Sequence, residues 1–157
     1  MYRMRRWSVN NARWLKKAYD IVEILLVKVS PVLNRVGYSR IEKPLSMIEK
    51  TSKKFLFDSK SCGQCILGAT GMSCPMNCPK SIRNGPCGGV RADGSCEVDP
   101  SMECVWVLAW EGNQRLVSSN YPIQRVQPAV DNRLVNHSAW LREVRLKENR
   151  TITGTHP

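Results

Sequence analysis

Residues 61–104 read SCGQCILGATGMSCPMNCPKSIRNGPCGGVRADGSCEVDPSMEC and contain all seven cysteines of the chain. Their spacing is C-x2-C-x8-C-x3-C-P, and three single cysteines follow at similar intervals. A cysteine buried in a core behaves as a small apolar residue, and core cysteines are normally scattered along a chain. So dense a group in one segment therefore points to chemistry of the thiols, in disulfides or in a metal site.

Disulfides are the less favoured interpretation. An odd number of cysteines leaves one thiol unpaired, and residues 1–15 contain neither an apolar segment nor the small-residue cleavage site of a secretory signal. We therefore expect a cytoplasmic, reducing location, where clustered cysteines more commonly bind a metal.

The spacing favours iron–sulfur over zinc. A zinc site of two knuckles needs a second C-x2-C pair, but only Cys62 and Cys65 form one, and His137 and His156 lack the spacing of a Cys2His2 finger. Cys74 and the Cys78-Pro79 pair instead resemble the C-x3-C-P end of bacterial ferredoxin motifs. Zinc stays open as the alternative metal. The predicted ligands are Cys62, Cys65, Cys74, Cys78, Cys87, Cys96 and Cys104.

The number of clusters stays open. One 4Fe-4S cluster takes four thiolates and leaves three, whereas two clusters need one ligand more than the chain has. One cysteine is then a spare thiol, a second centre takes a ligand from elsewhere, or a cluster and a zinc ion share the set.

The segments outside the cysteine block are predicted to be helical in part. Apolar residues recur at three- and four-residue steps over residues 7–36, which predicts a helix that Pro31 ends or kinks. This helix either packs on its own domain or docks on a partner subunit. Residues 37–60 read as a connector with a short helix, and 111–113 as a turn. Ser138 is placed to cap a last helix.

Composition and charge exclude several classes of protein. The 157 residues have ordinary globular composition, and the best apolar run, residues 21–29, is interrupted by Glu23 and Lys28, so no membrane span is predicted. Residues 1–60 hold 14 Lys and Arg against 5 Asp and Glu. This basic segment suggests a nucleic-acid-binding zinc protein, but the cysteine block has no basic recognition helix and few aromatic residues for stacking. We therefore expect no nucleic-acid partner.

Together these patterns predict a small cysteine-rich, metal-stabilised, loop-dominated domain with flanking α-helices. Three regions are expected: a basic helical arm over 1–60, a cysteine-rich metal domain over 61–112, and an extension with a short helix over 113–157.

The cysteine block also resembles a known family. The stretches CGQC at 62–65, GMSCPMNCPK at 71–80, NGPCGG at 84–89, GSCE at 94–97 and CVW at 104–106 are similar to the C-terminal domain of methylenetetrahydrofolate reductase. That domain also occurs as the small subunit of two-subunit reductases in anaerobic bacteria. The similarity runs from about Ser61 to Trp110 and continues faintly into the tail.

The resemblance implies a TIM-barrel flavoprotein partner that carries FMN and handles the folate, because this chain is too short for a barrel of about 250 residues. The chain would relay electrons to or from that partner through one or two 4Fe-4S clusters, with the seven cysteines as ligands and no catalytic residue. A further electron-donor protein could take part. The alternative is a zinc-binding accessory subunit without a redox role.

Overall fold

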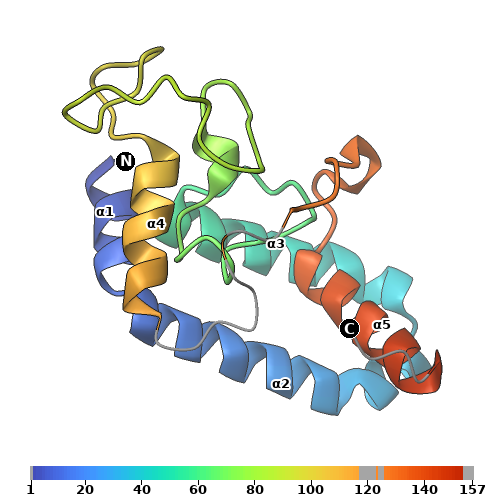
Figure 1. The fold of residues 1–157 in the computed structure, drawn as a ribbon. Helices are drawn as coiled ribbons and strands as arrows, with labels where there is room; N and C mark the ends of the chain where they lie inside the picture. Colours follow the sequence, from blue (N-terminus) through green and yellow to red (C-terminus); the bar gives the residue numbers. More distant parts are fainter. Residues whose placement is uncertain (1, 117–122, 124–125, 154–157) are drawn as a thin grey trace.

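The computed structural model describes residues 2–116, 123 and 126–153. Five α-helices account for most of this part of the chain (Figure 1): α1 (Tyr2–Asn10), α2 (Ala12–Val36), α3 (Tyr38–Phe57), α4 (Val105–Arg115) and α5 (Ala139–Thr153). Two short 3-10 helices are η1 (Pro75–Asn77) and η2 (Asn132–Leu134). The described residues form no β-strand beyond two isolated bridges, Val90 with Cys96 and Ser95 with Glu103.

The predicted fold class is wrong. The protein is a helical assembly, and no group of three or more His, Cys, Asp or Glu in its described part lies close enough to hold a metal ion. The physical reason is that the helices outside the cysteine block bury apolar residues of their own. Val9 of α1, Ala109 of α4 and Val144 of α5 are all fully buried. Helix packing, rather than a metal, therefore forms the core.

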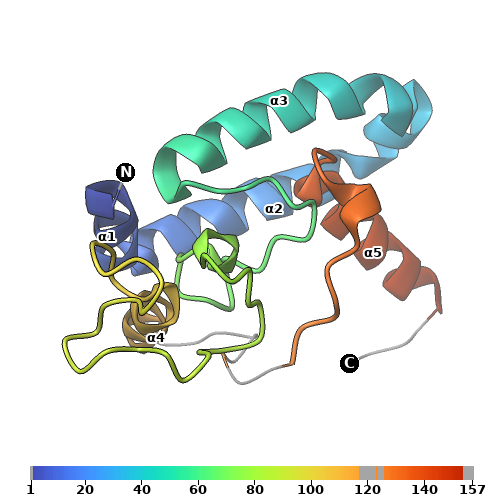
Figure 2. The same ribbon diagram turned by 90° about the horizontal axis from the view of Figure 1, so that it is seen from above.

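The amino-terminal segment forms two helices rather than one. The helix is interrupted at Asn11, whose side chain donates a hydrogen bond to the carbonyl of Trp7 at 2.9 Å. Pro31 lies inside α2 and does not end it, because the helix continues to Val36. It ends at Gly37, whose φ of +90° is a conformation that other residues adopt only with strain. This turn sends α3 back alongside α2 (Figure 2).

Helix α3 differs most from its prediction. It spans 20 residues instead of forming a short helix in a connector. Met47 and Ile48 are exposed at 70% and 61%, while the charged residues Glu49 and Lys53 are buried. The helix thus turns a partly polar face inward, and that face borders the site described below.

Helix α1 joins the end of α3 to α4. Ser8 and Val9 are fully buried, and the Ser8 hydroxyl donates to the carbonyl of Leu56 at the end of α3. Arg5 pairs with Asp58 at 2.5 Å, just after α3. Arg6 pairs with Glu111 of α4 at 2.9 Å. Helix α1 therefore fixes α3 and α4 relative to each other.

The cysteine-containing loops lie on one side of the α2–α3 hairpin and extend from the start of α5 to α4 (Figures 1 and 2). Their apolar residues join the helices in one cluster, made of Ala12, Phe57, Leu67, Met72 and Cys74. Close backbone contact adds to this docking, since a Cβ atom on Gly112 of α4 would lie 2.0 Å from the Gly71 carbonyl oxygen. The predicted turn at 111–113 is wrong, because these residues continue α4. No helix in the described part is long and apolar enough to cross a membrane.

Candidate functional site

The C-x2-C loop is held in place by the carboxyl-terminal part of the chain. Gly63 has a φ of +70°, and a Cβ atom on it would lie 2.0 Å from the carbonyl oxygen of Leu134. Only glycine therefore allows the loop to pass so close to η2. The Asn136 N–H also donates to the Ser61 carbonyl at 3.0 Å. The loop between Cys62 and Cys65 is consequently clamped under η2.

This clamp places three cysteines around one cavity. Cys62, Cys65 and Cys74 all line a pocket of about 30 Å³. Two buried cationic side chains, Lys53 and Arg83, line the same pocket. The arrangement brings one buried and two half-buried thiols beside two buried positive charges, and electrostatic interactions there are stronger than in water.

Arg83 is the cation beside Cys62. Its side chain is 6% exposed, donates to the Gln64 carbonyl at 2.6 Å and points a second nitrogen at the Cys62 sulfur at 3.7 Å. Its Nε is buried with no hydrogen-bond partner, and no carboxylate in the described residues pairs with it. Arg83 therefore places a buried positive charge beside the Cys62 sulfur, and such a charge favours an anionic partner.

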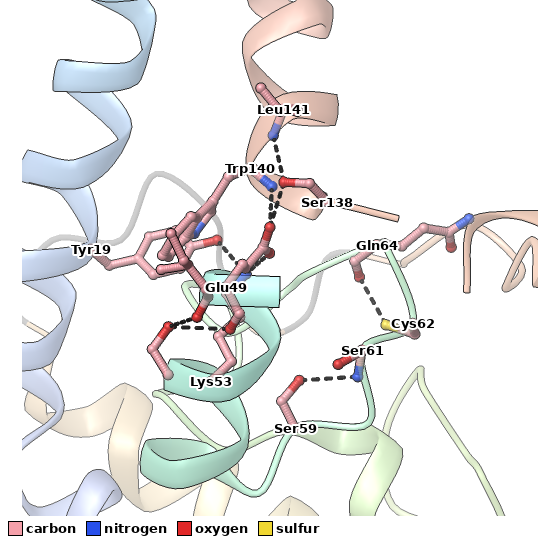
Figure 3. Close-up of polar contacts among 12 residues, drawn as sticks. Tyr19, Glu49, Lys53, Ser59, Ser61, Cys62, Gln64, Ser138, Trp140 and Leu141 are labelled. Carbon is pink, nitrogen blue, oxygen red and sulfur yellow. Dashed lines mark hydrogen bonds and ion pairs between the residues drawn. The ribbon is translucent and has the colours of Figure 1, made fainter. Parts of the chain in front are cut away.

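Lys53 is the cation beside Cys65, and Figure 3 shows the polar network around it. Its ammonium lies 2.5 Å from Glu49 and 3.4 Å from the Tyr19 hydroxyl. Burial works against the charge of Lys53, but Cys65 and Glu49 more than offset it, so the pKa of Lys53 is raised. The pKa of Tyr19 is raised well above its ordinary value by burial, then by Cys65. Lys53 thus stays charged and Tyr19 neutral beside the thiol.

The start of α5 completes the network. Glu49 accepts hydrogen bonds from the Ser138 hydroxyl at 2.6 Å and the Trp140 N–H at 3.3 Å (Figure 3). The predicted cap is confirmed, because the Leu141 N–H donates to the Ser138 hydroxyl at 3.2 Å. The Trp140 ring also faces Lys53, whose ammonium lies 5.0 Å from the ring centroid. The cap of α5 and the buried charge pair of α3 therefore belong to one hydrogen-bonded network.

Cys74 is the most buried of the seven thiols. Burial raises its pKa, Cys65 and Cys62 raise it further, and hydrogen bonds from the Lys60 and Met76 backbone oppose the shift. Cys78 lies at the other end of η1 and is half-buried.

The remaining cysteines lie in the loop before α4. Cys87 is exposed beside Lys80 and Glu97, which form an ion pair. The Cys96 N–H donates to Met102 at 3.0 Å, and the Cys104 N–H donates to Gly94 at 2.9 Å. The structure thus brings Cys62, Cys65 and Cys74 to one pocket but does not gather all seven predicted ligands.

These residues fit a metal centre in chemistry but not in arrangement. Thiolates are the ligands of iron–sulfur clusters, and three of the four that one cluster needs line the pocket. No set of three such groups in the described residues lies within metal-binding reach, however, and the cavity is small. His137 lines this pocket as well, whereas His156 lies outside the described residues. In this conformation the pocket is a cluster of thiols and cations rather than a formed metal site.

The charged and polar residues of this site were not predicted from the sequence. Glu49, Lys53, Tyr19 and Arg83 were not predicted to act, and only the four-residue spacing of Glu49 and Lys53 gave a signal. Such pairs usually stabilise an exposed helix face. Nothing local distinguishes this buried pair from an exposed one.

The family comparison bears on this same region. Residues 38–133 match the family model described as "Methylene-tetrahydrofolate reductase C terminal". This segment runs from α3 through the cysteine loops and α4 to η2, and covers more than half of the chain. The chain belongs to this family. The resemblance inferred from the cysteine motifs is therefore confirmed. No curated protein and no solved structure matches the chain significantly.

Proposed function

We propose that this chain is a non-catalytic accessory subunit of a methylenetetrahydrofolate reductase, and that its cysteines hold an iron–sulfur centre that passes electrons to or from a flavoprotein partner. Family membership supports the association with the reductase. The observation that carries the electron-transfer role is the pocket where Cys62, Cys65 and Cys74 meet the cations Lys53 and Arg83.

The two cations give the proposal its physical basis. Thiolates must lose their protons to bind iron, and nearby positive charge favours the deprotonated form. Lys53 and Arg83 supply that charge from buried positions. The close contact at Gly63 and the cap of α5 hold the thiols and the cations in fixed positions relative to each other. These residues would therefore prepare the thiols for a centre, while the folate chemistry belongs to the partner that holds the flavin.

Metal analysis of the protein purified without oxygen tests the proposal. We expect iron and acid-labile sulfide in equal amounts, with absorbance near 400 nm that dithionite bleaches. Cys65→Ser changes the pocket, and Cys87→Ser changes an exposed cysteine outside it. If Cys65→Ser removes all iron while Cys87→Ser removes none, one centre lies at the pocket. If each removes about half, the chain holds two centres.

Stoichiometric zinc without sulfide would contradict the redox role and leave an accessory subunit that only stabilises its partner. A second measurement follows the flavin of the reductase directly. When the reduced chain is mixed with the oxidised flavoprotein without oxygen, flavin absorbance should decrease, and the Cys65→Ser chain should not cause this decrease.

A further inference from the structure

Helix α2 carries an apolar strip that no described residue covers. Its members are exposed between 45% and 69%, and they recur at three-, four- and seven-residue steps: Trp14, Ile21, Leu25, Val29, Val32 and Val36. These steps place all six along one side of the helix, and Ile24, 54% exposed, lies beside them. We call this strip the α2 seam. It lies opposite the face of α2 that packs on α3, α4 and α5.

Basic side chains border the α2 seam. Arg13, Lys17, Lys28 and Arg35 are all exposed, and none forms an ion pair within the described part of the chain. Lys17 instead lies over the Trp14 ring, 5.0 Å from its centroid. The acidic residues of the helix are engaged elsewhere, because Asp20 pairs with Lys16 and Glu23 pairs with Lys147. The seam is therefore apolar in the middle and positive at its edge.

We infer that the α2 seam is the docking surface for an amphipathic helix of the reductase flavoprotein, with an apolar stripe bordered by acidic side chains. This inference rests on the proposed function for the identity of the partner. The seam itself lies outside residues 38–133, so it is not part of the segment that the family model matches.

The charge of the seam selects this occupant. A second copy packed antiparallel would bring the same basic edges together, which is repulsive. An apolar strip that repeats at three- and four-residue steps along the whole helix is a face on which another helix packs. An acidic border on the partner would complement Lys17, Lys28 and Arg35.

Binding to the methylenetetrahydrofolate reductase flavoprotein of the same organism tests the inference. The full chain and the flavoprotein are titrated calorimetrically at 50 and 300 mM salt. Ile21→Glu with Leu25→Glu should weaken binding by about thirtyfold or more, as expected when central anchors of an interface are lost. Lys17→Glu with Lys28→Glu should weaken it at low salt and reduce its salt dependence. Met47→Glu with Phe55→Glu changes two residues of α3 that are exposed at 70% and 69%; this variant is the control and should bind normally.

Each other outcome overturns the inference. If the Ile21 and Leu25 variant binds the flavoprotein as tightly as the wild type, the seam is not the interface, and the accessory role stands. If the wild type does not bind the flavoprotein, both the seam and the partner assignment fail, while the iron content of the free chain still reports on its redox role. If the wild type forms a dimer and the Ile21 and Leu25 variant is a monomer, the seam binds a second copy of the chain. Seam-dependent binding to vesicles of anionic lipid, without flavoprotein binding, would assign it to a membrane.

Discussion

Glu49 is the residue on which the buried network depends. The residue is 5% exposed, and its carboxylate contacts the Lys53 ammonium, the Ser138 hydroxyl and the Trp140 N–H. A buried ion pair adds little net stability when compared with an apolar pair of the same shape, but removing one partner leaves a buried charge uncompensated. The inward face of α3 therefore needs both Glu49 and Lys53, because neither charge is compensated without the other.

We therefore expect Glu49→Gln to lower the free energy of unfolding by about 3 kcal/mol or more, because Lys53 loses its counter-ion in a buried position. Urea denaturation followed by circular dichroism measures this change. The double variant Glu49→Gln with Lys53→Met should recover most of the loss, since it removes the stranded charge. A loss below about 1 kcal/mol in the single variant would show that water or Cys65 compensates Lys53 instead.

Gly112 and Gly68 offer a matched test of backbone packing. A Cβ atom on Gly112 would meet the Gly71 backbone at 2.0 Å, whereas one on Gly68 would meet only the flexible end of Lys16 at 3.3 Å. Gly112→Ala should therefore lower the free energy of unfolding by at least about 1 to 3 kcal/mol, despite the better helix propensity of alanine. Gly68→Ala should change it by less than about 0.5 kcal/mol. Equal effects in urea denaturation would mean that α4 and the Gly71 loop can separate at little cost.

At the scale of the elements, Glu148 fastens α5 to the hairpin of α2 and α3. Its carboxylate accepts hydrogen bonds from Asn34 at 3.1 Å and Tyr38 at 3.0 Å. The bond from Ser30 lowers the pKa of Glu148 most, partial burial opposes the shift, and Tyr38, Asn34 and Arg145 add to it. One carboxylate thus joins three helices through its charged form.

This lowered pKa predicts a dependence of stability on pH. A carboxylate whose folded pKa lies below its unfolded value stabilises the fold fully above the unfolded pKa, near 4.5, and progressively loses this contribution as the pH falls through the folded value. Glu148→Gln cannot titrate, so its unfolding free energy should fall less steeply between about pH 5 and pH 3. Parallel pH profiles for the wild type and this variant, measured by urea denaturation, would contradict the assignment.

The helices differ in how far the sequence could predict them. The periodicity of residues 14–29 predicted the body of α2 but not the break at Asn11, and the cap at Ser138 predicted the start of α5, because both are local signals. The inward face of α3 was not predictable, since Glu49 and Lys53 are buried only because Tyr19, Ser138 and Trp140 arrive from distant segments. The cysteine spacing indicated thiol chemistry and the family, but not the cations that share the pocket.

At the scale of the whole molecule, the family segment is not a structural unit by itself. Residues 38–133 exclude Val9 and Ala12, which are fully buried, and Leu141 and Val144, which lie in the core beside α3. Helices α1, α2 and α5 therefore cover the matched segment on several sides. The segment carries the cysteines, but its surroundings supply much of its core.

We accordingly expect the excised segment 38–133 to remain largely unfolded, whereas the full chain folds cooperatively. Excision would expose Phe57, Leu67 and Met72 to water, since Ala12 and its neighbours in α2 leave the cluster that contains them. It would also strand Lys53 without Tyr19 and leave Glu49 without Ser138. Proton NMR of the two chains under the same conditions measures this difference. Dispersed amide signals from the excised segment would show instead that the loops and α3 form a core without the flanking helices. Helices α1, α2 and α5 would then only dock on that core.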